Sequence, residues 1–185
     1  MIYGDRIRLR ALEEKDLPFF VQWLNDPELR QFLFLHMPLS TADEEDWYRE
    51  QLDKPPEERP LTIEIQSERK GGWKIIGNCG FIKLDWRSRA AELGIQIGEK
   101  AAWNQGYGTR AVQLLVEHGF QTLNLHRIWL RVFDFNGRAI QVYRKIGFTE
   151  EGRLRQAYYH QGRYHDLLVM GLLRQEWIDR EKGAS

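Results

Sequence analysis

The stretch Trp103-Asn104-Gln105-Gly106-Tyr107-Gly108-Thr109-Arg110 lies between a run with strand-like alternation and a run with helical periodicity. Its two glycines let backbone N–H groups turn toward one point without obstruction from a Cβ atom. The helix that follows leaves its first N–H groups without intrahelical partners and carries partial positive charge at that end. The pattern predicts either a phosphate or pyrophosphate site, or a tight turn from strand to helix that binds nothing.

Helical periodicity begins directly after these glycines. Six positions fall on one face of the predicted helix: Val112, Leu115, Val116, Gly119, Phe120 and Leu123. Residues 92–98 upstream and 128–133 downstream are strand-like, and residues 139–146 form a short amphipathic helix that Gly147 closes. The centre of the chain is therefore a β-loop-α-β unit followed by a short helix.

The N-terminal part begins with a strand and two helices. Residues 6–11 alternate arginines with apolar residues, which predicts a strand with one buried and one solvated face. Asp16 is predicted to cap a helix that ends near Asn25. Thr41 and Glu44 have the spacing of a capping box, which predicts the start of a second helix.

The remaining strands read as antiparallel neighbours. Residues 61–66 and 73–84 flank a polar turn at 67–72, and a closing hairpin spans about 153–159 and 163–173. This order of elements predicts a mixed α+β (α/β) fold, with a mostly antiparallel central sheet and helices on both faces.

The composition is that of an ordinary globular chain, with 185 residues, 27 Lys plus Arg against 27 Asp plus Glu, and one cysteine. This length can bury a core in a single domain over 1–185 without a disulfide. The neutral balance argues against a duplex nucleic-acid partner, and the apolar runs are too short to span a membrane. The N-terminus carries no secretory signal pattern, so the expected location is the cytoplasm.

A nucleotide-binding alternative starts from the same glycines. Gly106-x-Gly108-x-x-Ala111 matches a dinucleotide fingerprint, with Asp134 as the ribose ligand. In that fold the first glycine follows its strand almost directly, whereas residues 99–105 intervene here. We rank this alternative below a site for another phosphate-bearing ligand.

Two blocks of the sequence resemble the GNAT superfamily of acetyl-CoA-dependent N-acetyltransferases. They are Gly106-Tyr107-Gly108-Thr109, and the run from Asn136 through Arg138, Ala139 and Tyr143 to Phe148. The N-terminal Arg8-Leu9-Arg10 and the tail at 151–177 are similar to the RimJ/RimL-type branch, which includes bacterial spermidine acetyltransferases.

The resemblance implies the GNAT acyl-CoA N-acyltransferase fold, with acetyl-CoA as co-substrate and no metal. Amides of the glycine loop would hold the CoA pyrophosphate, and the edge of the strand at 95–97 would pair with the pantetheine arm. The positions that match cofactor-binding residues are Ile95, Gln96, Ile97, Gln105, Gly106, Tyr107, Gly108, Thr109, Arg110, Asn136, Arg138, Ala139 and Tyr143. Asn136 is also a good N-cap for the short helix, so capping and cofactor contact are both open for its side chain. Trp103 stands where the family usually has Gln or Arg, which argues against a side-chain phosphate contact there.

The resemblance implies catalytic roles for two residues. Tyr143 matches the tyrosine that protonates the departing thiolate, although periodicity alone places it in the core. Glu92 matches a glutamate near the acceptor amine in polyamine-acetylating relatives. It would take the amine proton directly or through a water, and a surface strand glutamate is the alternative. The implied transfer is direct, without a covalent acetyl-enzyme.

The expected acceptor is a small-molecule or peptide primary amine, with a protein N-terminal amine favoured. The segment 30–40, RQFLFLHMPLS, lacks the acidic pair carried by polyamine acetyltransferases of this type, so a polyamine or an amino sugar is the alternative. A non-catalytic acyl-CoA-binding regulatory protein is an alternative of another class. A homodimer is compatible with the resemblance.

Two further features carry weaker signals. His160 and His165 flank the hairpin turn without cysteine or clustered carboxylates, which indicates a solvated hairpin instead of a metal site. Cys79 lies in a predicted strand with no paired histidine, so it is a poor candidate for a nucleophile.

Overall fold

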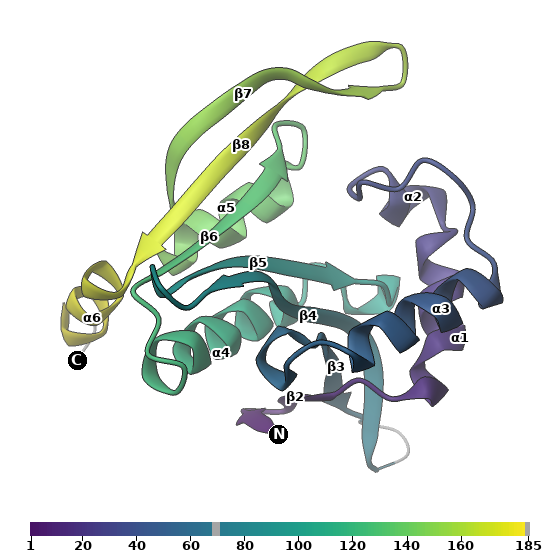
Figure 1. The fold of residues 1–185 in the computed structure, drawn as a ribbon, viewed down its shortest axis with the longest axis horizontal. Coiled ribbons are helices and arrows are strands. Elements are labelled where there is room, and N and C mark those ends of the chain that lie inside the picture. The colour runs from purple at the N-terminus through teal and green to yellow at the C-terminus, as the bar shows by residue number, and fades with distance from the viewer. Residues whose placement is uncertain (68–70, 184–185) are drawn as a thin grey trace. The chain divides into compact units, whose positions relative to one another are not determined.

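The computed structural model describes residues 1–67 and 71–183, and Figure 1 shows its elements. The strands are β1 (Ile2–Gly4), β2 (Ile7–Ala11), β3 (Leu61–Gln66), β4 (Trp73–Asp85), β5 (Ala90–Ile97), β6 (Arg127–Phe133), β7 (Thr149–His160) and β8 (Arg163–Leu173). The helices are α1 (Leu17–Leu24), α2 (Pro27–Arg30), α3 (Thr41–Leu52), α4 (Tyr107–Gln121), α5 (Gly137–Ile146) and α6 (Arg174–Gly183). The polar turn predicted at 67–72 includes residues 68–70, which lie outside the described residues.

The strands are ordered β1-β2-β3-β4-β5-β6-β8-β7 by hydrogen bonding. The β5–β6 pair is parallel, while β1–β2, β2–β3, β3–β4, β6–β8 and β7–β8 are antiparallel. The predicted mixed fold with a mostly antiparallel sheet is confirmed. The chain divides into two compact units, Met1–Ile82 with Gly94–Leu115 and Lys83–Leu93 with the residues from Val116 onward.

The first unit places helices α1, α2 and α3 around an apolar cluster. The buried members of this cluster are Leu17, Phe20, Trp23, Leu24, Leu29 and Ile75. Trp23 also packs against the backbone of Gly98, because a Cβ atom there would lie 2.0 Å from the indole ring. Glycine is therefore required directly after β5, so that α1 can approach the chain there.

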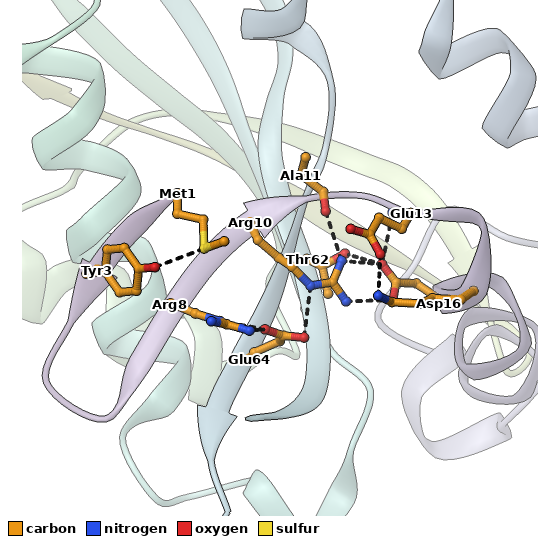
Figure 2. Close-up of polar contacts among 10 residues, drawn as sticks. Met1, Tyr3, Arg8, Arg10, Ala11, Glu13, Asp16, Thr62 and Glu64 are labelled. Carbon is orange, nitrogen blue, oxygen red and sulfur yellow. Dashed lines mark hydrogen bonds and ion pairs between the residues drawn. The ribbon is translucent and has the colours of Figure 1, made fainter. Parts of the chain in front are cut away.

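The predicted solvated face of β2 is wrong, because Arg10 is only 7% exposed. Figure 2 shows its guanidinium between two carboxylates from different elements. Nη1 and Nη2 donate to Asp16 at 2.7 Å each, and Nε donates to Glu64 Oε1 on β3 at 2.8 Å. Thr62 adds a hydrogen bond to Asp16 at 2.8 Å, so the polar face of β2 is a buried ion network.

The predicted caps of the first two helices also need correction. Asp16 immediately precedes α1, but its side chain makes no capping hydrogen bond to that helix and binds Arg10 instead. The capping box of α3 is Ser40 with Asp43, one residue before the predicted Thr41 and Glu44. Glu44 takes no part in the capping box and is 4% exposed.

In the second unit, α5 begins and ends as predicted. The Asn136 side chain accepts a hydrogen bond from the Ala139 N–H at 3.2 Å, and Gly147 has φ 119°, the left-handed conformation that ends the helix. The hairpin of β7 and β8, the long yellow-green arm in Figure 1, turns at Gln161 and Gly162, both with positive φ. Helix α6 follows β8 and brings Trp177 within 5.6 Å of Phe120, ring centre to ring centre.

No helix within 1–67 and 71–183 is both long and apolar enough to cross a membrane.

Candidate active site

The predicted site residues fall into two groups, one in each unit. Residues 95–97 and 105–110 belong to the first unit, and Glu92 with the α5 residues belongs to the second.

The glycine loop ends where α4 begins. Gly106 has φ 83°, and Tyr107 is the first helical residue. An α-helix leaves its first four N–H groups without intrahelical partners, and here these belong to Gly106, Tyr107, Gly108 and Thr109. The Arg110 N–H donates to the Gly106 carbonyl at 3.0 Å, so the predicted backbone contact at Arg110 is already taken. The loop can therefore present donors from Gly106 to Thr109 to an anion.

The two positions in the loop require or allow glycine for different physical reasons. Gly106 is required by its positive φ, which L side chains rarely adopt. Gly108 has helical backbone, and a Cβ atom there would lie 3.6 Å from Ile97 Cγ1, an ordinary contact. The turn alone explains Gly106 but not Gly108, which favours the ligand explanation for the second glycine.

Two hydrogen bonds from outside the β5–β6 ladder hold the C-terminal end of β5. The Trp103 indole N–H donates to the Ile97 carbonyl at 2.7 Å, and the Gly98 N–H donates to the Ile76 carbonyl at 2.8 Å. The parallel ladder with β6 is formed by Ala90–Glu92 and includes none of Ile95, Gln96 and Ile97. In the sequence Trp103 is notable only as a departure from the family motif. In the structure its indole N–H fixes the position of the Ile97 carbonyl, one of the three predicted strand-edge residues.

In the second unit, Tyr143 is 8% exposed and its ring meets Phe148 edge-on at 5.9 Å. Burial raises the pKa of its hydroxyl to about 12, so the phenol keeps its proton across the neutral range. On the same helix, the Asn136 side chain is the N-cap, which settles one of its two predicted roles. Arg138 is exposed and Ala139 is half-buried at the start of α5.

Glu92 is buried and ion-paired, which corrects the alternative of a surface glutamate. It is 2% exposed, and its Oε1 accepts a hydrogen bond from Arg131 Nε at 2.7 Å. Its other oxygen, Oε2, is buried and has no hydrogen-bond partner among the described residues. The sequence identified Glu92 but not Arg131, because the two residues lie 39 positions apart and only the β5–β6 register brings them together.

The hairpin histidines are only partly the solvated residues predicted. His165 is 7% exposed, and its Nδ1 lies 3.2 Å from Asp134 Oδ1. The Asp134 carboxylate also accepts the Asp166 N–H at 3.2 Å, so its contacts stabilise the hairpin. No group of three or more potential metal ligands occurs in the part of the chain that the structure describes.

Cys79 is buried in β4, and burial raises the pKa of its thiol to about 12. A thiol that stays protonated at neutral pH is a weak nucleophile. The expectation that Cys79 is not the nucleophile agrees with this environment.

Comparison with known proteins identifies the family. An uncharacterised N-acetyltransferase of Bacillus licheniformis, p20, is 30% identical over 95% of this chain and 97% of its own. The spermidine N(1)-acetyltransferase of Vibrio cholerae is 29% identical over 97% of this chain and 99% of its own. The crystal structure of a Vibrio cholerae spermidine N-acetyltransferase with CoA and spermine superposes with a TM-score of 0.84 at 27% identity, over 95% of this chain and 99% of that chain. Residues 6–149 match the acetyltransferase (GNAT) domain model, so the chain belongs to the GNAT family of acetyl-CoA-dependent N-acetyltransferases.

Proposed function

We propose that this acetyltransferase moves the acetyl group directly from acetyl-CoA to a primary amine that is held at Glu92. The observation that carries the proposal is the Glu92 carboxylate, which is buried with Oε2 lacking a partner in the described chain. A buried acceptor of this kind costs about 1–3 kcal/mol until a donor reaches it. An amine N–H, or a water bound to the amine, is such a donor.

The reaction balances without a covalent enzyme intermediate. The neutral amine nitrogen attacks the thioester carbonyl, the C–N bond forms, the C–S bond breaks, and CoA leaves as the thiolate. The amine loses one proton to Glu92 or to a water beside it, and the sulfur gains one. An N–H at the 95–97 edge of β5 would stabilise the tetrahedral oxyanion.

Tyr143 has a narrower role in this scheme than the family resemblance implies. Full proton transfer from a phenol with a pKa of about 12 to a thiolate of pKa about 8.5 costs about 5 kcal/mol. A hydrogen bond from the Tyr143 hydroxyl to the leaving sulfur avoids most of this cost. We therefore propose Tyr143 as the donor that stabilises the thiolate, with final protonation completed as CoA departs.

The cofactor is proposed to use both groups of residues that the resemblance assigns to it. Helix α4 would hold the pyrophosphate through the N–H groups of Tyr107, Gly108 and Thr109, which is supported by the otherwise unexplained glycine at 108. In the second unit Arg138 is proposed as the cofactor contact because it lies exposed at the start of α5, which the Asn136 side chain caps.

The proposed acceptor is an exposed peptide N-terminal amine. The loop after α2, residues 31–39, contains no carboxylate that would attract a polycation. A polyamine is the second candidate, favoured by the spermidine acetyltransferases of Vibrio cholerae and Escherichia coli among the relatives. A Bacillus subtilis relative, YdaF, is named as a candidate ribosomal N-acetyltransferase and is 31% identical over 94% of this chain.

Release of the CoA thiol from acetyl-CoA tests the proposal. The acceptors are N-terminal peptides, spermidine and amino sugars, with a reaction lacking any amine as the control. We expect turnover with at least one primary amine and faster turnover with the peptides than with spermidine. Binding of acetyl-CoA without turnover on any amine would overturn the proposed transfer.

We also propose that the chain acts in the cytoplasm as one domain and assembles with copies of itself. A free buried thiol fits a reducing compartment. The strands β4 and β5 and the helix α4 each contribute residues to both compact units, which supports one domain. The Vibrio cholerae enzyme has a dodecameric structure. Light scattering across protein concentrations tests the assembly.

A further inference from the structure

The pair formed by Glu92 and Arg131 joins two neighbouring strands of the second unit. In the parallel ladder Glu92 of β5 lies opposite Trp129 of β6. Side chains two residues apart on a strand point to the same face, so Arg131 shares the face of Trp129 and therefore of Glu92. The strand register thus determines which cation faces the carboxylate, and the 2.7 Å contact follows from it.

The two carboxylate oxygens of Glu92 differ in their hydrogen bonding. Oε1 is held by the guanidinium, whereas Oε2 is buried and lacks a partner among the described residues. A carboxylate with one oxygen fixed has little rotational freedom, so the direction of the other oxygen is set in advance. Preorganised groups of this kind favour the geometry in which a ligand reacts.

We infer that Arg131 is a positioning residue that aims Glu92 Oε2 at the acceptor and selects an amine with a single positive charge. The inference rests on the proposed role of Glu92 in holding the acceptor. Arg131 itself contacts the carboxylate and not the reacting atoms, so its effect on transfer passes through Glu92.

Charge balance determines the class of acceptor. The guanidinium already neutralises the Glu92 carboxylate, so the pair has no net negative charge with which to attract a polycation. A second ammonium group near this pair would face the positive charge of Arg131. The site therefore fits a primary amine whose surroundings are neutral, such as a peptide N-terminus or a monoamine, better than spermidine.

The test compares Arg131→Met with Arg131→Lys, using peptide amines, a simple monoamine and spermidine as acceptors. Arg127→Met is the matched control, because Arg127 lies on the same strand and pairs with Glu151. We expect Arg131→Met to lower kcat on the peptide amine on the order of 100-fold, as a misplaced reactive group does, with a smaller change in the KM for acetyl-CoA. Arg131→Lys should restore part of the rate, and Arg127→Met should leave it near that of the wild type.

Selectivity is the readout that a purely structural role does not move. Removing the guanidinium leaves the negative charge of Glu92 without a cation beside it, which favours a polycationic acceptor. The ratio of kcat/KM for spermidine to kcat/KM for the peptide amine should therefore rise on the order of tenfold in Arg131→Met. A fall by the same factor for every amine, or a control that behaves like Arg131→Met, would overturn the inference.

A second variant separates this inference from the proposed function. If Arg131 acts through Glu92, Arg131→Met should have little further effect in a Glu92→Gln background, because the two changes remove one unit. Full additivity of the two losses would show that Arg131 acts elsewhere. Wild-type protein that transfers acetyl to no amine would instead defeat the proposed function, whatever the variants do.

Discussion

At the scale of single residues, the Arg10–Asp16 pair shows how polar side chains are stabilised inside this protein. Both side chains are buried, and every strong contact of the guanidinium is to a carboxylate or a carbonyl oxygen. We expect Asp16→Asn to lower the free energy of unfolding by about 3–5 kcal/mol, because it leaves a buried guanidinium with one charged partner fewer. Urea denaturation measures this change.

Glu13→Gln is the control for this prediction, since Glu13 pairs with Lys15 at the surface and such pairs contribute about 0–1 kcal/mol. A loss in Asp16→Asn no larger than that in Glu13→Gln would show that the buried network does not stabilise the fold.

The same carboxylate makes stability depend on pH. Burial alone would raise the pKa of Asp16, but hydrogen bonds from Arg10, the Glu13 N–H and Thr62 outweigh it and leave the pKa below its ordinary value. A carboxyl with a lowered folded pKa stabilises the protein above its unfolded pKa of about 3.9 and loses that contribution as the pH falls further. Wild-type protein should lose stability between pH 5 and 3 more steeply than Asp16→Asn, and parallel curves would contradict this.

Tyr143 is the residue whose catalytic role is most directly tested by deletion of one atom. Tyr143→Phe keeps the ring packed on Phe148 and removes only the hydroxyl. We expect kcat to fall about 10²-fold or more, the range for loss of one donor to a developing charge, with a much smaller change in acetyl-CoA affinity. Steady-state kinetics and equilibrium binding measure the two effects. An unchanged kcat would show that Tyr143 has only a packing role.

The structural role of a single residue was predicted well where it depends only on neighbouring residues in the sequence. Asn136 and Gly147 follow from helix capping, which depends on the few residues around them. The burial of Arg10 was missed because Glu64, its partner on β3, lies 54 residues away in the sequence. Glu92 could be proposed from a motif, but its pairing with Arg131 depends on the register of two strands.

At the scale of elements, Trp103 connects the glycine loop to the end of β5. Its indole N–H holds the Ile97 carbonyl at 2.7 Å, at the position where the family usually has Gln or Arg. Trp103→Phe keeps most of the apolar contact and removes this bond, whose loss costs about 0.5–1.5 kcal/mol. We expect acetyl-CoA to bind about 2- to 10-fold more weakly, as measured by calorimetry.

Trp86→Phe is the comparison for this variant, because Trp86 is half-exposed outside the loop. Equal affinities in wild type and Trp103→Phe would show that the bond does not set the shape of the loop for the cofactor.

Helix α3 contains a buried carboxyl that pairs with no cation among the described residues. Glu44 Oε2 has no partner in the described ranges, and burial raises the pKa of Glu44 to about 6. A carboxyl with a raised folded pKa stabilises the protein most below its unfolded pKa, and this contribution is lost as the pH rises through about 6. We therefore expect Glu44→Gln to be more stable than wild type at pH 7.5 by about 1–2 kcal/mol, with little difference near pH 4.5.

Glu50→Gln, an exposed change on the same helix, is the control. Urea unfolding at the two pH values decides the matter. A Glu44→Gln variant that is less stable than wild type at pH 7.5 would mean that the carboxylate has a stabilising partner.

Long, periodic elements were the ones that sequence predicted best. Strand β3 and helices α4 and α5 agree within about two residues, because each has an uninterrupted pattern or a clear cap. Strand β1 and helix α2 have three and four residues, too few for a pattern to emerge. Helix α6 has no buried residues, so it lacks the apolar stripe that would have predicted it.

At the scale of the whole molecule, the balance of 27 basic and 27 acidic residues explains more than the absence of a nucleic-acid signature. Buried carboxylates are paired with arginines: Arg10 is itself buried between Asp16 and Glu64, and the exposed Arg131 pairs with the buried Glu92. Composition gave the number of charges but not their pairing, because pairing is decided by strand order and register. The same register places Glu92 and Arg131 together and so determines the proposed acceptor class.

The continuity of three elements predicts how the whole chain unfolds. Strands β4 and β5 and helix α4 each begin in one compact unit and end in the other. Unfolding one unit alone would break the hydrogen-bond ladder of α4 midway and shorten both strands, so we expect one cooperative transition. Hydrogen exchange at increasing urea concentrations, followed in peptides from 61–66 and from 163–173, should give the same midpoint as far-UV circular dichroism. Acetyl-CoA at 100 times its Kd should move every midpoint together, by about 2.7 kcal/mol of stability. Two midpoints, or a shift confined to one set of peptides, would show that the units unfold as separate domains and that the cofactor stabilises only one of them.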